Sequence, residues 1–417
     1  MAQPQQTVDH LFRVESGRMV AVLVKLFGLP QVALAQDIVQ ETLVAALETW
    51  KLKGLPDNPR AWLYQVAKNR TLDHLRRNRH FHTHIAPQLA AALENDTQAQ
   101  HRLDDFFLET EIEDAQLRMM FACCHPDIPD EAQLILILRT LCGLSIAEIA
   151  SAFLAQEDAI AKRLYRAKEK IRTANLVLEA PSGPALQERL DAVLQAVYLL
   201  FNEGYKSTST DTVIRRDLCD EALRLGALLA GHPLGNLPKT NALMALMCYH
   251  AARFDGRMDS DGNIVLLEHQ DRSLWDKTLI AIAYRYFSAS FSGAAISEYH
   301  IEAAIASYHA QAPHFEATNW QAIFYCYELL YKANPSPFVE LNRAIAWGYA
   351  EGPAAGIEAL QKIVGLEHHY LYHTALGDFY QKSGEPEKAR LAYQKAIGYA
   401  KLPAELKLLR DKVSYGF

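Results

Sequence analysis

Long hydrophobic runs are missing from this sequence of 417 residues. The most strongly apolar run, LILIL at residues 134–138, is far shorter than the roughly 20 apolar residues that cross a bilayer. The first residues hold no basic segment followed by an apolar core, so we expect no secretory signal. Cysteine is scarce, and its six copies lie in apolar, helix-like runs, which predicts buried, reduced thiols. We therefore expect a cytoplasmic protein with no membrane partner.

Several other features are absent or rare. The 20 glycines and 17 prolines are too few for a collagen-like chain, and a hydrophobic content of 50% excludes wholesale disorder. The motifs G-x-S-x-G, the Walker phosphate loop, G-x-G-x-x-G after a strand and H-E-x-x-H do not occur. We expect a protein that is not an enzyme, with no catalytic residue, no metal and no cofactor.

Charge is distributed unevenly along the chain. The formal net charge of −7 argues weakly against binding to nucleic acid. However, residues 51–79 carry eight Lys or Arg against two Asp, and residues 159–172 carry six against one Glu. Between them, residues 94–114 carry eight acidic side chains against one Arg. Two basic patches joined by an acidic connector indicate local sites for an anionic partner better than the overall charge does.

Helical periodicity dominates the sequence, and sustained alternation of period two is absent, which predicts an all-α fold. The polar stretch at 81–113 and the Pro- and Gly-containing stretch at 179–184 divide the chain. We expect a first helical module at 7–80, an acidic linker at 81–113, a second helical module at 114–175 and a large helical extension at 185–417.

The first module contains an acidic helix followed by a basic one. In 31–51, the side chains of Asp37, Gln40 and Glu41 share one exposed face opposite an apolar stripe that includes Leu47. The next helix starts at Pro59 and is basic, with aromatic residues such as Tyr64 interleaved. Positive charges bind phosphates, and aromatic rings stack on unpaired bases, so this combination of side chains suits binding to melted DNA. The alternative is an ordinary solvated amphipathic hairpin.

The second module has the pattern of a helix-turn-helix. An apolar helix ends at Gly143, and Ser145 with Glu148 forms a capping box for a short second helix. In the third helix one stripe is apolar, and the opposite side offers Lys and Arg to base edges and phosphates. The predicted buried stripe consists of Ile160, Leu164, Ala167 and Ile171. The alternative is a solvated basic helix in a bundle.

Together, LAQDIVQETLVAAL, NPRAWLYQVAKNRTLDHLRR and LSIAEIASAFLAQEDAIAKRLYRAKEKI resemble regions 2 and 4 of the sigma-70 family, in its extracytoplasmic-function group. The resemblance implies that the chain directs core RNA polymerase to promoters. It implies that the acidic connector threads the polymerase channel and that the loop 51–58 captures a flipped minus-ten base.

The resemblance also implies contacts with the coiled coil and flap of polymerase. The implied coiled-coil contacts are Asp37, Gln40 and Glu41. The implied minus-ten residues are Trp62, Asn69, Arg70, Asp73, Arg76 and Arg77. The implied minus-35 residues are Asp158, Ala159, Ala161, Lys162, Arg163 and Arg166.

The extension carries a tetratricopeptide-like pattern at 373–403, although His373 stands where a packing Trp is expected. A weaker copy precedes it at 341–364. The pattern residues are Leu376, Gly377, Tyr380, Ala389, Tyr393 and Ala396. Stacked helix pairs offer a surface to an unidentified protein or ligand. The extension resembles that of one subgroup of the same sigma factors, which implies tuning of activity in cis.

Three patterns imitate metal sites. Cys123, Cys124 and His125 lack a second ligand pair for zinc, and three alternating histidines at 80–84 fit a solvated linker. Residues 257–268 nearly fit a calcium loop, but Arg257 takes its first position, which favours a polar turn or hairpin.

Three interpretations of function remain open from the sequence. The favoured one is a sigma factor in which Lys162 and Arg166 read bases, while Arg163, Arg70, Arg76 and Arg77 mainly contact phosphates. The second is a helix-turn-helix regulator that acts without polymerase. The third is a repeat scaffold with inactive N-terminal modules.

Overall fold

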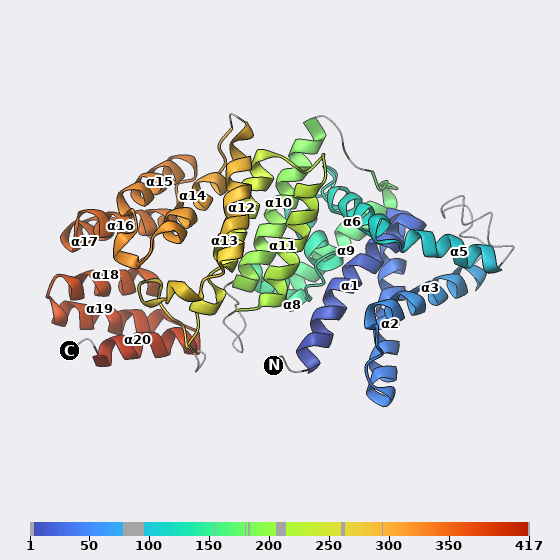
Figure 1. Cartoon of the computed structure of the whole chain (residues 1–417), viewed down its shortest axis with the longest axis horizontal. Helices are drawn as coiled ribbons and strands as arrows, with labels where there is room; N and C mark the ends of the chain where they lie inside the picture. Colours follow the sequence, from blue (N-terminus) through green and yellow to red (C-terminus); the bar gives the residue numbers. More distant parts are fainter. Residues whose placement is uncertain are drawn as a thin grey trace. The chain divides into compact units, whose positions relative to one another are not determined.

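The computed structural model describes residues 4–77, 96–153, 155–179, 181, 184–205, 214–259, 263–293 and 295–415 (Figure 1). These residues are helical apart from their connections, and the one β-bridge among them pairs Met258 with Ile264. The predicted all-α fold is confirmed. The chain forms two compact units, an N-terminal unit of 1–203 and 217–234 and a C-terminal unit of 204–216 and 235–417. The division between the units therefore falls inside the segment expected to be a separate extension.

The first module consists of α1 (Pro4–Phe27), the short η1 (Leu29–Gln31), α2 (Val32–Lys53) and α3 (Pro59–Arg77). Helices α1 and α2 end at Gly28 and Gly54, whose φ angles are 87° and 80°. Residues other than glycine disfavour such positive φ angles. The side chain of Asn58 accepts a hydrogen bond from the Ala61 amide (3.0 Å) and caps α3, whose first residue is the expected proline. Because α2 runs to Lys53, the loop expected at 51–58 comprises only 54–58.

The acidic connector is helical over its described part. It contains α5 (Asp96–Phe106) and the beginning of α6 (Glu109–Cys123). The second module continues with α7 (Asp130–Thr140), α8 (Ile146–Ala152) and α9 (Glu157–Thr173). The predicted capping box is present: Ser145 Oγ accepts from the Glu148 amide (3.2 Å), and Glu148 Oε2 accepts from the Ser145 amide (2.6 Å).

The first two helices of the extension complete the N-terminal unit. Most of α10 (Pro184–Tyr205) and α11 (Arg216–Gly231) belongs to that unit. The thiol of Cys219 on α11 donates to the carbonyl of Phe201 on α10 (3.4 Å), and Arg224 donates to the side chain of Gln116 on α6 (3.1 Å). The beginning of the extension is therefore part of the same compact unit as the two modules.

The C-terminal unit consists of helices that pack as antiparallel neighbours (Figure 1). These helices are α12 (Pro238–Ala251), α13 (Lys277–Ala289), α14 (Glu298–Gln311), α15 (Trp320–Ala333), α16 (Pro337–Glu351), α17 (Pro353–Gln361), α18 (Tyr370–Lys382), α19 (Pro386–Tyr399) and α20 (Pro403–Tyr415).

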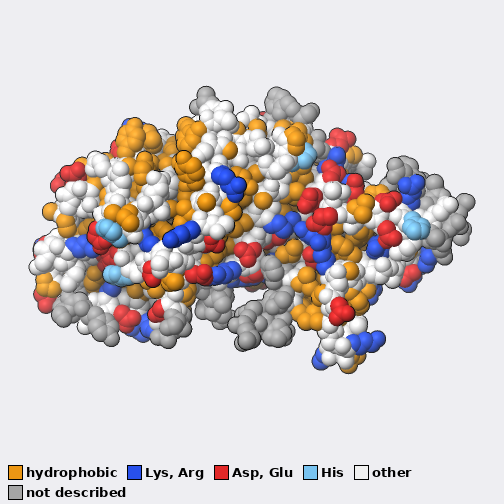
Figure 2. All heavy atoms as spheres, in the orientation of Figure 1, with side chains coloured by type: hydrophobic (Ala, Val, Ile, Leu, Met, Phe, Trp, Pro, Cys, Tyr) orange, Lys and Arg blue, Asp and Glu red, His pale blue; other side chains and the backbone are white. Residues whose placement is uncertain are grey.

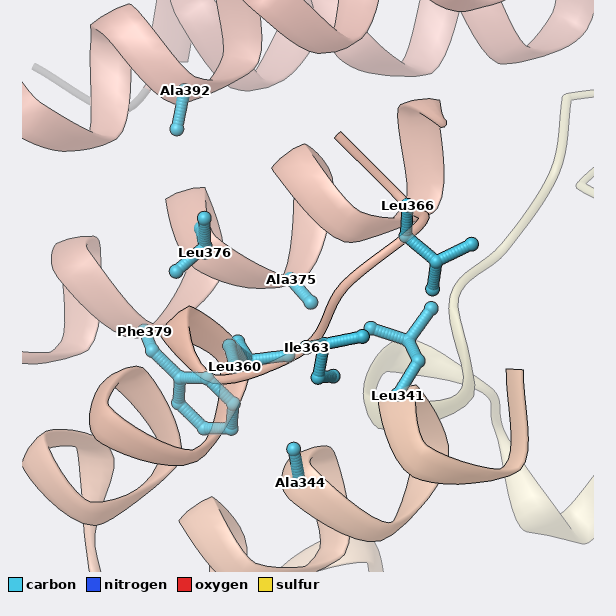
Figure 3. Packing of buried hydrophobic residues seen from close by; sticks show 9 residues of the cluster. All are labelled: Leu341, Ala344, Leu360, Ile363, Leu366, Ala375, Leu376, Phe379 and Ala392. Carbon is cyan, nitrogen blue, oxygen red and sulfur yellow. The ribbon is translucent and has the colours of Figure 1, made fainter. Parts of the chain in front are cut away.

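The tetratricopeptide-like pair is α18 and α19. A Cβ added at Gly377 would lie 2.4 Å from the ring of Tyr393, so the pair packs closely because glycine stands there. His373, in place of Trp, is buried and contacts the carbonyl of Glu367 at 2.8 Å. Figure 3 shows the apolar cluster that joins this pair to α16 and α17, with Phe379 inside it. Stacked helix pairs are thus present where the sequence pattern indicated them.

The six cysteines are buried, as expected, and take part in no disulfide. Burial raises the pKa of the Cys123 thiol to about 12, which keeps it protonated and unreactive. No helix among the described residues is long and apolar enough to cross a membrane.

The calcium-like segment is described on both sides of residues 260–262, where Asp259 and Asn263 are hydrogen-bonded to each other. The amide of Asp259 donates to the carbonyl of Asn263 (3.0 Å), and the carboxylate of Asp259 accepts from Asn263. Within the described ranges, no group of three or more His, Cys, Asp or Glu is arranged to hold a metal. The expected positions Asp261 and Gly262, and the histidines at 80–84, lie outside the described residues.

Candidate functional site

One face of α2 presents the three acidic or polar residues predicted from the sequence. Asp37, Gln40 and Glu41 are all exposed, while Val39 on the opposite side is buried. The apolar stripe is shorter than expected, because Leu47 is 52% exposed rather than buried. Together with Val44, which is 48% exposed, it extends the acidic face by two apolar side chains.

This extension of the face was missed by the sequence reasoning, although the spacing could have indicated it. Val44 follows Gln40 by four residues, and Leu47 follows Val44 by three, so a helix places all of them on one side. A face that mixes carboxylates with exposed aliphatic groups is typical of a contact with another protein rather than with DNA.

Most of the predicted minus-ten residues on α3 are accessible. Asn69, Asp73, Arg76 and Arg77 are exposed, and Arg76 pairs loosely with Asp73 (3.6 Å). These side chains form a polar, mainly basic strip along the outer side of the helix.

The other two predicted residues of α3 are half-buried against α2. Trp62 packs edge-on against Trp50, with ring centroids 5.4 Å apart. The guanidinium of Arg70 pairs with the carboxylate of Glu41 on α2 at 2.6 Å. The acidic face of α2 and the basic strip of α3 therefore adjoin each other.

Tyr64 does not serve the role that the aromatic pattern suggested. Its hydroxyl donates to the buried carboxylate of Glu15 (2.5 Å), and the guanidinium of Arg60 lies over its ring at 5.1 Å. Burial and the charge of Glu15 raise the pKa of Tyr64 to about 12. The ring is part of the core of the first module and is not available for stacking on a base.

The acidic connector pairs with basic residues of the first module. Lys68 on α3 contacts Asp104 (2.6 Å), and Arg60 together with Arg18 contacts Glu109. Burial alone would raise the pKa of Glu109. The hydrogen bonds and charges of Arg60 and Arg18 nevertheless hold this pKa below its ordinary value. The basic patch at 51–79 is therefore partly neutralised within the chain.

Helix α9 has the predicted division into two sides. The apolar stripe is buried throughout, at Ile160, Leu164, Ala167 and Ile171. Asp158, Ala161, Lys162 and Arg166 are exposed, whereas Ala159 is half-buried. In the part of the chain that the structure describes, no carboxylate lies within ion-pair distance of Lys162 or Arg166. The ammonium of Lys162 and the guanidinium of Arg166 are thus accessible to an external anion.

Arg163 lies at the edge of this face. It pairs with Glu131 at the start of α7 at 2.8 Å and is half-buried. A side chain that is already held by a carboxylate has less freedom to reach a base edge, which suits a contact with the backbone of a nucleic acid.

The two modules touch each other inside the N-terminal unit. A Cβ added at Gly17 of α1 would lie 2.0 Å from the carbonyl oxygen of Leu141, so only glycine permits this approach. Arg13 of α1 contacts Glu148 (3.3 Å) in the first turn of α8. The ammonium of Lys168 on α9 donates to Gln36 on α2. The acidic face of α2 and the basic helix α9 are thereby brought together.

Figure 2 shows acidic and basic side chains interspersed over the part of the visible face where α1 and α6 lie. One of the groups that link these helices is Lys25 of α1, which pairs with Glu111 and Asp114 of α6, both at 2.7 Å. Burial alone would lower the pKa of Lys25, but its hydrogen bonds to these carboxylates raise it overall.

Comparisons with known families agree with this arrangement of modules. Residues 11–81 match the family model of sigma-70 region 2, and residues 118–171 match that of sigma-70 region 4. Residues 189–291 match a family of unknown function, DUF6596. An uncharacterized protein of Rhizobium meliloti (strain 1021) is 35% identical over 385 residues, which cover 92% of this chain and 90% of that protein. No solved structure matches the chain.

Proposed function

Since the chain belongs to the sigma-70 family, as an extracytoplasmic-function sigma factor with a C-terminal extension that directs RNA polymerase to promoters, we propose roles for its individual residues. The first module is sigma region 2 and the second is sigma region 4. Their partners are core RNA polymerase and promoter DNA. Sigma factor families are typically not enzymes, so the chemistry of RNA synthesis is performed by the polymerase.

Helix α2 docks on the coiled coil of the largest polymerase subunit through Asp37, Gln40 and Glu41. Their exposure on a single face supports this role, and so do the two aliphatic side chains that continue the face. Region 4 contacts the polymerase flap. The carboxylates select a basic partner, while the aliphatic groups supply buried apolar area.

Helix α3 binds the minus-ten element, with the loop 54–58 beside it. Its proposed contacts are Trp62, Asn69, Arg70, Asp73, Arg76 and Arg77. The exposed guanidinium groups of Arg76 and Arg77 suit phosphates, and the exposed amide of Asn69 suits the edge of an unpaired base. Binding energy released by these contacts favours the melted duplex over the paired one.

Helix α9 reads the minus-35 element in the major groove. Lys162 and Arg166 contact base edges, and Arg163 contacts the DNA backbone. The other residues of the DNA-facing side are Asp158, Ala159 and Ala161. The support is geometric: the buried stripe fixes the helix, and the opposite side carries accessible cationic groups.

The extension tunes sigma activity in cis and offers a surface to a protein or ligand. The observation that supports tuning is that α10 and α11 belong to the same compact unit as the two sigma modules. A regulator that acts without polymerase would need no region 2, and neither the fold nor the family matches favour it.

The observation that carries the proposal is the presence of both sigma regions, in order, each with its predicted polar face exposed. The test is run-off transcription with purified core polymerase on a genomic promoter library, using the full chain. We expect promoter-specific transcripts that Asp37→Ala reduces about tenfold, while Asp411→Ala, on an exposed position of α20, leaves them unchanged. Equal activity of the two variants would refute the assigned polymerase face.

A further inference from the structure

A cavity of about 530 Å³ lies inside the N-terminal unit, where the extension meets the sigma regions. Its walls come from α1 of region 2, from the beginning of α6 and from the end of α11 in the extension. Cavities that bind small molecules have volumes of roughly 300–1,000 Å³, so this one has room for a ligand at least as large as an amino acid. Its lining residues are not among those proposed to contact polymerase or promoter DNA.

Part of the cavity wall is apolar. Leu117 of α6 is buried, and from α11 the half-buried Leu228 and the exposed Ala227 also line the cavity. Aliphatic groups such as these can cover the apolar body of a ligand, and the release of water from both surfaces favours binding.

Arg18 of α1 brings a buried guanidinium to the cavity, since its side chain belongs to a residue that is 8% exposed. One of its terminal nitrogens pairs with Glu109 of α6 at 3.0 Å. Its Nε–H, however, meets no hydrogen-bond acceptor among the described residues. A buried N–H without an acceptor is costly, and one that belongs to a cation binds an anionic oxygen most strongly. Arg18 therefore calls for an acceptor from a ligand.

His232, directly after α11, offers a second donor on the wall. Its Nδ1 accepts a hydrogen bond from the amide of Leu234 (3.2 Å). An imidazole whose Nδ1 accepts carries its proton on Nε2, so the Nε2–H can donate to a ligand. Two donors on one wall, one of them cationic, suit a carboxylate.

Two other charged groups of the wall already have partners of opposite charge. The guanidinium of Arg224 donates to the carboxylate of Glu221 through two nitrogens, both at 2.8 Å. Asp114 pairs with Lys25 (2.7 Å) and Arg118 (2.9 Å). Because each of these charges is compensated within the chain, neither adds much attraction for a charged ligand.

Glu113 is the exception on the acidic side of the cavity. Its side chain is exposed, and within the described ranges no Lys or Arg lies at ion-pair distance from it. Glu113 follows Glu109, the partner of Arg18, by four residues, so the two positions are one turn, or about 6 Å, apart along α6. A free carboxylate one turn away from the guanidinium suits the ammonium of a ligand whose other end is a carboxylate.

We infer that the cavity between α1, α6 and α11 binds a small zwitterion with an apolar body, namely a free apolar amino acid. Its carboxylate accepts hydrogen bonds from Arg18 and His232, and its ammonium pairs with Glu113. Its apolar body lies against Leu117 and Leu228. The bound ligand links the extension to region 2 through α11 and α1. The binding step is independent of the function proposed above, because it needs neither polymerase nor DNA.

The first experiment is isothermal titration calorimetry of the full-length protein with leucine, methionine and phenylalanine. We expect one site per chain and a Kd below about 5 mM for at least one of the three. The analogue of that amino acid without its amino group, and the analogue without its carboxyl group, should each bind at least about tenfold more weakly. No binding of any of the three amino acids would overturn the site. An analogue that binds as tightly as the amino acid would overturn the zwitterion.

The second experiment uses variants at exposed positions. Glu113→Gln should weaken binding of the amino acid about tenfold and leave binding of the analogue without the amino group unchanged. Glu188→Gln on α10 is the matched control and should have no effect. Ala227→Trp should abolish binding by filling the cavity. Melting temperatures without ligand should be the same for all of these proteins, because no buried group is changed.

Two outcomes of the second experiment would contradict the inference. Equal affinities of Glu113→Gln and Glu188→Gln for the amino acid would refute the pairing of Glu113 with the ammonium. An Ala227→Trp protein that binds as the wild type does would show that the ligand lies outside the cavity.

Discussion

Both compact units bury apolar side chains, but among the described residues ion pairs between helices are more numerous in the N-terminal unit than in the C-terminal unit. In the N-terminal unit, ion pairs link the sigma regions to each other and to the connector, as between Lys25 and Asp114 (2.7 Å) or Lys68 and Asp104 (2.6 Å). In the C-terminal unit, successive helix pairs meet through apolar side chains and glycines, with Phe379 in the centre of one cluster (Figure 3). Partly exposed ion pairs contribute about 0–1 kcal/mol each, whereas a buried aromatic ring contributes several times as much.

The comparison indicates that charged contacts have a larger share in joining the helices of the N-terminal unit. A sigma factor must separate its regions to bind two promoter elements, and charged contacts can be exchanged for phosphates or polymerase side chains at little net cost. Repeat helices that share an apolar core stay together, since opening them would expose that core to water. Substitutions in the two units should therefore affect different measurements.

The largest effect is expected in the C-terminal unit. Phe379→Ala removes a ring that is 2% exposed and leaves a cavity between α16, α17 and α18, so it should destabilise the protein by about 3–5 kcal/mol. Thermal or denaturant unfolding measures this. Val364→Ala, at a position that is 77% exposed, should change stability by less than about 0.5 kcal/mol. Equal shifts from both variants would contradict the importance of the apolar cluster.

The next effect is expected in promoter selection, without a change in stability. Lys162→Ala removes an exposed ammonium from the reading face of α9, so discrimination between promoters should fall by about 1–3 kcal/mol. Binding to a randomised minus-35 library, followed by sequencing, measures the preference. The melting temperature should stay unchanged because the side chain has no role in the buried stripe.

A smaller effect is expected for a phosphate contact in region 2. Arg77→Ala should weaken binding of the polymerase complex to all promoters alike, and the slope of log K against log salt should fall by about 1. A change of sequence preference for this variant, equal to that of Lys162→Ala, would contradict the division between base and phosphate contacts.

The smallest effect is expected for the pH dependence of the ion pairs. Burial alone would raise the pKa of Asp114, but the hydrogen bonds from Arg118 and Lys25 hold it below its ordinary value. A lowered pKa means that the pair stabilises the fold above about pH 4 and stops doing so as the pH falls through the lowered value. Asp114→Asn should therefore cost about 0.2–1 kcal/mol at pH 7 and less at pH 3, as measured by denaturant unfolding. A cost that is the same at both pH values would show that the ion pair is not its source.

Features that depend on neighbouring residues in the sequence were predictable. The capping box of Ser145 and Glu148 and the start of α3 at Pro59 follow from local hydrogen bonding and a fixed backbone angle. The buried stripe of α9 follows from the helical period, since four apolar positions repeat on one side. The exposure of Asp37, Gln40 and Glu41 follows from the same period.

Features that depend on distant residues were not predictable in this way. Tyr64 and Trp62 stand alike in a basic helix, but only the fold gives Tyr64 a buried carboxylate partner 49 residues away. The residues proposed to contact DNA and polymerase remain predictions, because their partners are separate molecules.

The sequence by itself therefore determined the helices, their caps, the two sigma regions and the side of each helix that carries charge, since these depend on spacing within one or two turns. Only the tertiary structure decided which charges are already paired, that α10 and α11 belong with the sigma regions, and that Lys168 lies against Gln36. Such contacts join residues far apart in the sequence, such as Lys168 and Gln36, which are 132 positions apart, and a long-range pairing leaves no periodic signal in the chain.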